Sequence, residues 1–205
     1  MDNSFCLESL NVSCETIEMM NNYVDLLSKW NSAINLVSKS SFLDVWHRHI
    51  LNSAQLLSYV VPEKTHWVDL GSGAGFPGIV ISILAKDKFP LLKMTLIESD
   101  QRKCVFLNEV SRELKLDIII LSDRIENCSN LKADIISARA LAPMSKLLEF
   151  FQMHSGKNCK ALFLKGERVY SELNQINKID LFQITVEPSL VGGIGYIVTV
   201  NRKEN

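Results

Sequence analysis

The sequence has neither a large excess of charge of one sign nor a long apolar run. Its 22 lysines and arginines are balanced by 23 aspartates and glutamates, which gives a formal net charge of -1. Binding nucleic acid through bulk charge needs a large positive excess, so this chain would need a local basic patch instead. No apolar run approaches the roughly 20 residues of a membrane-spanning helix. We therefore expect a protein outside the membrane, with 47% apolar residues available for a core.

Cysteine is also scarce, and its spacing does not fit a metal site. The five cysteines are odd in number, and no two of them form a C-x-x-C pair. This pattern argues against a disulfide framework or a zinc site, so we expect free thiols, no metal and a cytoplasmic location. The start MDNSFCLESLNVSC lacks the basic residues and apolar core of a signal peptide. We find no linker and no repeat, so the 205 residues predict one compact unit.

Residues 14–60 have helical periodicity. Ser41 and Asp44 in this segment fit a capping box, in which each side chain satisfies a free backbone N–H at a helix start. We therefore predict an N-terminal helical cap over residues 1–62. The apolar residues at helical spacing are Ile17, Met20, Val24, Leu27 and Trp30, followed by Phe42, Val45, Trp46, Ile50, Ala54 and Leu57.

From residue 63 to residue 205, short apolar runs alternate with longer amphipathic ones. This alternation predicts an open α/β sheet of parallel strands with helices on both faces. The final stretch LFQITVEPSLVGGIGYIVTV instead predicts two antiparallel strands. We expect strands near 66–70, 93–98, 117–121, 133–138 and 160–165, and helices near 77–86, 101–115, 143–154 and 167–177.

The stretch WVDLGSGAGFPGI joins the first predicted strand to the helix after it. Asp69 ends the strand, glycines follow at positions 71, 73 and 75, and Pro77 suits the first position of a helix. Ligands of open α/β sheets bind at the carboxyl ends of the strands, which is where this loop lies. Glycines there let the backbone turn tightly and approach a ligand.

Two kinds of ligand fit this loop, besides a tight turn that binds nothing. Residues 73–78 match G-x-G-x-x-G, a weak sign of a dinucleotide site. Against it, the first glycine of that motif should follow the strand directly, and little chain is left for a substrate-binding part. The second kind is S-adenosylmethionine, because methyltransferases that depend on it typically have an acidic strand end followed by alternating glycines. Here that pattern runs from Asp69 through Gly71, Ser72 and Gly73 to Gly75. Asp69 would then face the cationic ammonium of the cofactor, directly or through water.

Two later loops favour S-adenosylmethionine. Glu98 ends the next strand, and an ionised carboxylate there can accept hydrogen bonds from both ribose hydroxyls. The alternative for Glu98 is a solvated strand end. After the third strand, the backbone of Ile125 and Glu126 could reach the adenine edge while the Ile125 side chain packs on its face, although an ordinary polar turn would look the same.

The sequence resembles the RsmG (GidB) family of bacterial methyltransferases, which act on N7 of a guanine in 16S ribosomal RNA. The resemblance runs from about residue 23 to residue 196. It depends on the segments LLSKWNSAINLVS, RHILNS, DLGSGAGFPGI, LIESDQRKCVFL, ISARALAP and FLKG. It implies a Rossmann-like class I methyltransferase fold with seven strands, the last antiparallel, and S-adenosylmethionine as cofactor.

The resemblance also implies roles for individual residues. Positions that match the family's cofactor contacts are Gly71, Phe76, Ile125, Glu126 and Arg139. Positions that match the family's substrate mouth are Arg48, His49 and Lys165. The sequence departs from the family pattern at Asn52, where an aspartate is common, and at Gly195, where a basic residue often stands.

The implied chemistry needs no catalytic base, because guanine N7 has a lone pair and no proton. The protein would align the reacting atoms, about 3–3.5 Å apart. Arg139 and Lys165 would bind phosphate, orient O6 or shape the pocket, and His49 is as compatible with a packed or capping histidine as with an RNA contact. Phe76 is a candidate to stack on the guanine. A basic rim is predicted from Lys29, Lys39, Arg48, Lys157, Lys160, Lys165 and Arg168.

The sequence leaves three other functions open. They are methylation of a small molecule or protein, a nicotinamide-dependent oxidoreductase, and an RNA-binding module without a cofactor. Our expectation is an enzyme acting on 16S rRNA in the 30S subunit, as a monomer.

Overall fold

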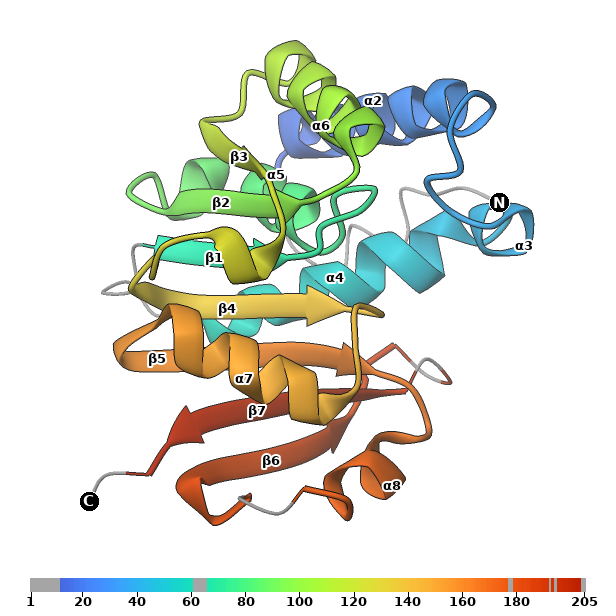
Figure 1. Cartoon of the computed structure of the whole chain (residues 1–205). Helices are drawn as coiled ribbons and strands as arrows, with labels where there is room; N and C mark the ends of the chain where they lie inside the picture. The colour runs from blue at the N-terminus through green and yellow to red at the C-terminus, as the bar shows by residue number, and fades with distance from the viewer. Residues whose placement is uncertain (1–11, 61–65, 177–178, 192, 194, 204–205) are drawn as a thin grey trace.

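The computed structural model describes residues 12–60, 66–176, 179–191, 193 and 195–203. In this part of the chain, seven strands form one sheet in the order β3-β2-β1-β4-β5-β7-β6 (Figure 1). The first five strands along the chain are parallel, and β7 is antiparallel to both β5 and β6, as predicted. The strands are β1 (His66–Leu70), β2 (Lys93–Glu98), β3 (Ile118–Ser122), β4 (Ala133–Arg139), β5 (Ser155–Lys165), β6 (Phe182–Pro188) and β7 (Tyr196–Arg202).

Helices cover both faces of the sheet (Figure 1). One face packs against the N-terminal helices, α5 and α6, and the other against α7 and α8. Alternate residues of each strand supply the two cores, so Trp67 belongs to the first and Val68 to the second. The helices are α2 (Cys14–Asn31), α3 (Lys39–Phe42), α4 (Asn52–Ala54), α5 (Gly78–Lys88), α6 (Gln101–Glu113), α7 (Met144–His154) and α8 (Val169–Leu173), with short π or 3₁₀ turns η1 (Trp46–Leu51), η2 (Gln55–Tyr59), η3 (Ile125–Asn127) and η4 (Ile179–Leu181).

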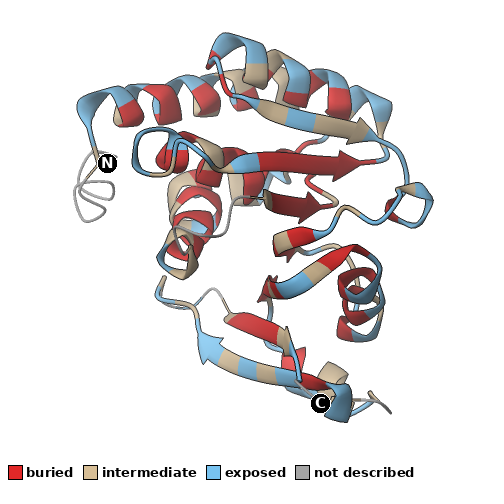
Figure 2. Ribbon diagram, turned by 90° about the vertical axis from the view of Figure 1, so that its left-hand side faces the viewer, coloured by how far each residue is buried: buried red, intermediate tan, exposed pale blue. Residues whose placement is uncertain are grey.

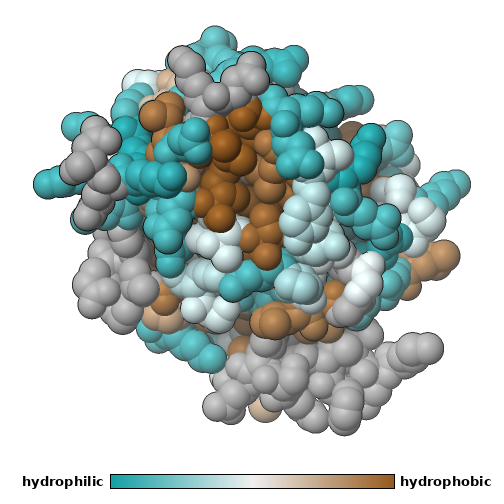
Figure 3. Space-filling model, turned by 90° about the horizontal axis from the view of Figure 1, so that it is seen from below, coloured by the Kyte–Doolittle hydropathy of each residue, from teal (hydrophilic) through white to brown (hydrophobic). Residues whose placement is uncertain are grey.

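Burial is greatest at the centre of the sheet. The strands β1 and β2 are buried along almost their whole length, whereas the edge strands β3 and β6 alternate between exposed and less exposed positions (Figure 2). Seen from below, apolar side chains gather in the middle of the face, with hydrophilic side chains around them (Figure 3). Among the described residues, no helix is long and apolar enough to cross a membrane.

The second N-terminal helix does not begin with the predicted capping box. The Ser38 side chain, not that of Ser41, caps α3 by accepting a hydrogen bond from the Ser41 backbone N–H. Ser38 has the extended backbone that an N-cap needs, while Ser41 already lies inside α3. Asp44 lies near His47, 3.6 Å from its Nδ1, instead of reaching back to a cap. The segment then continues through η1, α4 and η2 rather than as one regular helix.

Two other predicted boundaries were displaced. The helix after the glycine loop begins at Gly78, and Pro77 is its N-cap instead of its first residue. The helix predicted near 167–177 is short, and α8 spans only Val169–Leu173.

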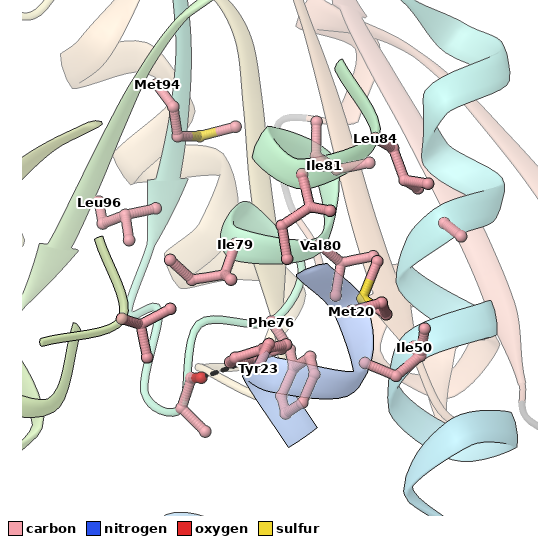
Figure 4. Close-up of a cluster of buried hydrophobic side chains, with 14 of the residues drawn as sticks. Met20, Tyr23, Ile50, Phe76, Ile79, Val80, Ile81, Leu84, Met94 and Leu96 are labelled. Carbon is pink, nitrogen blue, oxygen red and sulfur yellow. Dashed lines mark hydrogen bonds between the residues drawn. The ribbon is translucent and has the colours of Figure 1, made fainter. Parts of the chain in front are cut away.

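The N-terminal cap contributes directly to the core. Met20 and Tyr23 from α2, and Ile50 from η1, are fully buried against α5 and the glycine loop (Figure 4). The predicted boundary between residues 62 and 63 lies outside the described residues. Because the cap and the sheet share one apolar cluster, the cap stabilises the segments that carry the site.

Candidate cofactor and substrate site

The glycine loop leaves bare backbone at the carboxyl end of β1. Gly73 has a φ of +58°, a left-handed backbone conformation that residues other than glycine rarely adopt. A Cβ built on Gly73 would meet nothing closer than the Gly71 carbonyl oxygen, 3.9 Å away. Ser72 is buried, and its hydroxyl donates to the Asp69 carbonyl oxygen at 3.1 Å, which fixes the turn. The open space beside Gly73 suits a ligand that approaches the main chain.

Glu98 holds the glycine loop to the end of β2. Its Oε2 accepts a hydrogen bond from the Gly73 N–H, and its Oε1 accepts one from the Asp100 N–H, both at 2.8 Å. The side chain is 8% exposed. Each carboxylate oxygen can accept more than one hydrogen bond, so this buried carboxylate can also take hydroxyl donors such as those of a ribose.

Asp69 lies beneath the loop and is fully buried. Its Oδ1 accepts from the Ser137 hydroxyl at 2.6 Å, and its Oδ2 accepts from the Gly78 N–H at 3.3 Å. Burial raises the pKa of Asp69 to about 6, against the opposing effect of these hydrogen bonds. Asp69 therefore joins β1, β4 and the start of α5, and its contact with a cofactor ammonium stays a prediction.

The turn η3 follows β3, as the adenine-edge prediction requires. Ile125 is buried, whereas Glu126 is exposed and lies 3.7 Å from the Lys146 Nζ. The Ile125 carbonyl oxygen is 3.0 Å from Nε2 of the buried His154. His154 fixes this turn from α7, a role that sequence analysis missed because the two residues lie 29 positions apart.

Arg139, at the end of β4, connects the sheet to the cap. Its guanidinium lies 4.8 Å from the Phe76 ring centroid and donates through Nη1 to His49 Nδ1 and, at 3.4 Å, to the Arg48 carbonyl oxygen. Burial lowers the pKa of Arg139 to about 10. Burial and the charges of Arg139 and Arg48 lower the pKa of His49 to about 3. His49 is thus neutral at physiological pH, and the sequence motifs alone did not predict this pairing.

Phe76 is enclosed by protein groups. The His49 ring stacks on it at 4.8 Å, with an angle of 22°, and the Tyr23 ring lies 5.5 Å away. With 3% of its surface exposed, Phe76 leaves no free face for a guanine, so it connects the glycine loop to the cap instead. The Tyr23 hydroxyl also donates to the Ala74 carbonyl oxygen of the loop. Nothing in the sequence singled out Tyr23, whose contact spans 51 positions.

A cavity of about 1080 Å³ lies between the cap, the β4–α7 loop and the β5–α8 loop, and we call it the mouth cavity. It contains all three residues predicted to contact the substrate. It adjoins the glycine loop through Leu141, whose side chain occupies the place that a Cβ on Gly71 would need. The lining residues are Ser38, Ser40, Ser41, Arg48, His49, Asn52, Arg139, Ala140, Leu141, Ala142, Pro143, Leu164, Lys165, Gly166, Glu167, Arg168 and Glu172.

Lysine residues of β5 do not form the single rim that we predicted. Lys165 lies at the carboxyl end of the strand, in the mouth cavity. Lys160 lies five residues earlier, roughly 16 Å along the strand, and Lys157 lies farther still. The prediction was wrong for Lys157 and Lys160 because it ignored the direction of β5.

The two departures from the family pattern have structural explanations. Asn52 is buried, and its Oδ1 accepts hydrogen bonds from the Gln55 amide and the Ser189 hydroxyl, which joins the cap to the β6–β7 loop. Gly195 has a φ of +99°, and a Cβ there would overlap the Lys165 carbonyl oxygen. The backbone therefore requires glycine at this position.

Among the described residues, there is no group of three or more histidine, cysteine, aspartate or glutamate side chains that could hold a metal ion. The four described cysteines form no disulfide.

Solved structures establish the fold class. A magnesium protoporphyrin IX methyltransferase from Synechocystis has a TM-score of 0.62 at 10% identity, covering 88% of this chain and 97% of its own. A ribosomal protein L11 methylase from Lactobacillus delbrueckii has a TM-score of 0.60 at 16% identity, covering 75% of this chain and 77% of its own. The fold is that of class I methyltransferases.

Sequence comparison is more specific. The profile of the GidB family, described as rRNA small subunit methyltransferase G, matches residues 16–192. A ribosomal RNA small subunit methyltransferase G of Cereibacter sphaeroides is 44% identical over 90% of this chain and 89% of its own length. The protein of that name from Parvibaculum lavamentivorans is 41% identical over 93% of this chain and 84% of its own. The chain belongs to the GidB family of rRNA small subunit methyltransferases.

Proposed function

We propose that this protein transfers a methyl group from S-adenosylmethionine to N7 of a guanine in 16S rRNA. The observation that carries the proposal is the shared wall at Leu141. On one side of it lies the open glycine loop with its buried Glu98 carboxylate. On the other lies a cavity of about 1080 Å³, lined by four cationic and two acidic side chains, which has room for an unstacked nucleotide.

The residues at the carboxyl end of the sheet fit the cofactor. The bare backbone at Gly73 would contact the amino-acid part, Glu98 would accept from the ribose, and the η3 turn would border the adenine. Gly71, Ser72, Gly75 and Asp69 would act by shaping the loop. The bound cofactor would supply an electrophilic methyl group on a cationic sulfur.

The chain's own residues then have to present guanine N7 without opposing the reaction. The base gains positive charge as it is methylated, so a free cation aimed at N7 would raise the barrier. Arg139 is instead directed to His49 and the Arg48 carbonyl oxygen, and His49 is neutral. No proton leaves N7, so no described side chain needs to act as a base, and catalysis rests on alignment.

RNA binding would be modest and sensitive to salt, because only a few cations border the mouth cavity. Arg48 and Arg168 line it, while Lys165 is 10% exposed and bonded to the Glu172 carboxylate and the Ala142 carbonyl oxygen. A modest affinity suits an enzyme that visits a 30S particle briefly in the cytoplasm. We propose that it acts there as a monomer.

The direct test is methyl transfer from labelled S-adenosylmethionine to 30S subunits taken from cells that lack this activity, followed by mapping of the modified base. We expect a single 7-methylguanine in the 16S rRNA. Transfer to proteins or metabolites, but not to 30S subunits, would overturn the substrate assignment.

A second experiment tests the cofactor. S-adenosylhomocysteine should raise the thermal unfolding midpoint of the protein and NAD should not. The reverse result would favour the oxidoreductase.

A further inference from the structure

Glu172 is one of two carboxylates, with Glu167, in a cavity that four cationic side chains also line. It lies on α8 and lines the mouth cavity together with Arg48, Arg139 and Arg168. A negative charge placed beside an RNA backbone weakens binding unless it contacts something other than phosphate. The position of Glu172 therefore calls for a partner with hydrogen-bond donors.

The carboxylate is held by one of its two oxygens. Oε2 accepts from the Lys165 Nζ at 2.7 Å and from the Met144 N–H, at the start of α7, at 2.8 Å. Within the described part of the chain, Oε1 has no hydrogen-bond partner, and the side chain is 23% exposed. Oε1 is thus a fixed acceptor that remains available.

The surroundings keep Glu172 ionised. Burial alone would raise its pKa, but the hydrogen bonds from Lys165 and the Met144 N–H, with the charge of Arg168, lower the pKa overall. An ionised carboxylate only accepts hydrogen bonds. Lys165 also donates to the Ala142 carbonyl oxygen at 3.0 Å, so the same pair holds the β4–α7 loop.

We propose that Glu172 is a specificity-determining residue, which recognises guanine by accepting hydrogen bonds from its N1–H and its N2 amino group through Oε1. This inference rests on the proposed function. An unstacked base in a pocket is recognised by hydrogen bonds to its Watson–Crick edge. That edge of guanine carries donors and is remote from N7, so reading it leaves N7 free for methylation. Adenine has an acceptor at N1, which the carboxylate would repel.

The test compares guanine with inosine, which lacks only the N2 amino group. The substrates are 30S particles reconstituted with 16S rRNA that carries either base at the mapped position. For the unaltered protein, kcat/KM should be about tenfold lower with inosine, since one hydrogen bond to a charged acceptor is lost.

The informative variant is Glu172→Gln. Glutamine keeps the side-chain shape and one oxygen for Lys165 and Met144, but it replaces the free acceptor by an amide donor. We expect kcat/KM on guanine to fall at least tenfold, and the guanine-to-inosine ratio to fall from about ten towards one. Glu167→Gln alters the other carboxylate of the cavity lining, which has no such anchors among the described residues, and it should keep a ratio of about ten.

A purely structural role of Glu172 predicts a different result. Weakening of the β4–α7 loop would lower both rates equally, so an unchanged ratio in Glu172→Gln overturns the proposal. Affinity for S-adenosylhomocysteine and the thermal unfolding midpoint report whether the variant is folded. If Glu172→Gln does not fold, Glu172→Asp is used instead, because it keeps the charge but withdraws the acceptor by one methylene. An unchanged guanine-to-inosine ratio in Glu172→Asp would likewise overturn the proposal. Absence of transfer by the unaltered protein to guanine particles would instead contradict the proposed function.

Discussion

Gly73 tests the cofactor site at the scale of one residue. In Gly73→Asp, a carboxylate would enter the open space next to Glu98, whose Oε2 already bonds to the Gly73 N–H. Charge repulsion and occlusion should weaken S-adenosylhomocysteine binding at least tenfold, about 1.4 kcal/mol, measured by calorimetry. Gly193→Asp is the matched control, because Gly193 also has a positive φ, of +75°, and open space around it. Equal losses in both variants would show that backbone strain, and not the ligand site, is responsible.

His49 gives the protein a specific pH dependence. Its pKa is about 3 in the folded protein and about 6.5 when unfolded, so below pH 6.5 the unfolded state binds a proton that the folded state does not. Stability should therefore be lost as pH falls from 6.5 towards 3, by about 1.4 kcal/mol per pH unit. His49→Gln removes this loss.

Urea unfolding at pH 7.5, 6.5, 5.5 and 4.5 measures the effect as a difference between the two proteins. Burial raises the pKa of Asp69 to about 6, so its contribution to stability increases as pH falls between about pH 6 and 4, opposite to that of His49. Asp69 is present in both proteins, so its contribution cancels in the difference between them. Parallel stability curves would mean that His49 is accessible to protons in the folded state.

At the scale of elements, α2 acts on the glycine loop through Tyr23. In Tyr23→Phe, the Ala74 carbonyl oxygen loses a buried donor, which should cost about 1–3 kcal/mol of unfolding free energy. Because Ala74 is next to Gly73, S-adenosylhomocysteine binding should also weaken several-fold. Tyr59→Phe removes another tyrosine hydroxyl bond, which is donated to the Glu187 carboxylate in an exposed place, and should cost less than about 1 kcal/mol. Calorimetry and urea unfolding check both variants, and equal effects would contradict a role for α2 at the site.

The elements differ in how far sequence predicts them. The strands of the core were predicted well, because a buried strand needs an apolar run that is visible in the sequence, as in β2. The glycine loop was located because a backbone that needs positive φ at three positions requires glycine there, and Gly71, Gly73 and Gly75 are visible in the sequence. The cap of α3 was misplaced because three serines, Ser38, Ser40 and Ser41, lie close together, and only the backbone conformation of Ser38 selects it.

The interactions around the site were less predictable. His154 and Ile125 meet because α7 packs over η3, and Tyr23 meets Ala74 because the cap folds back on the sheet. Such pairs depend on tertiary packing and leave no local pattern. The ion pair of Lys165 with Glu172 likewise required the structure, since Lys165 alone had suggested an RNA contact.

At the scale of the whole molecule, the small number of cations at the mouth cavity limits the salt dependence of RNA binding. With about two or three phosphate contacts, the logarithm of the affinity for 30S particles should fall with a slope of roughly -1.5 to -3 against the logarithm of salt concentration. Arg168→Gln should reduce the slope by about one. Lys157→Gln, at the opposite end of β5, should leave it unchanged, and a filter-binding series measures all three proteins. A reduced slope in Lys157→Gln would place the RNA elsewhere.

The way in which the cap enters the core has a consequence for how such a protein can change over evolution. Tyr23 and His49 from the cap enclose Phe76 of the glycine loop, and Arg139 of the sheet bonds back to the cap. The cap is therefore not an exchangeable module. A chimera that carries another methyltransferase's N-terminal helices would disturb the glycine loop even if the new helices folded. A change of substrate is therefore more accessible through substitutions in α8 and the β6–β7 loop than through replacement of the cap.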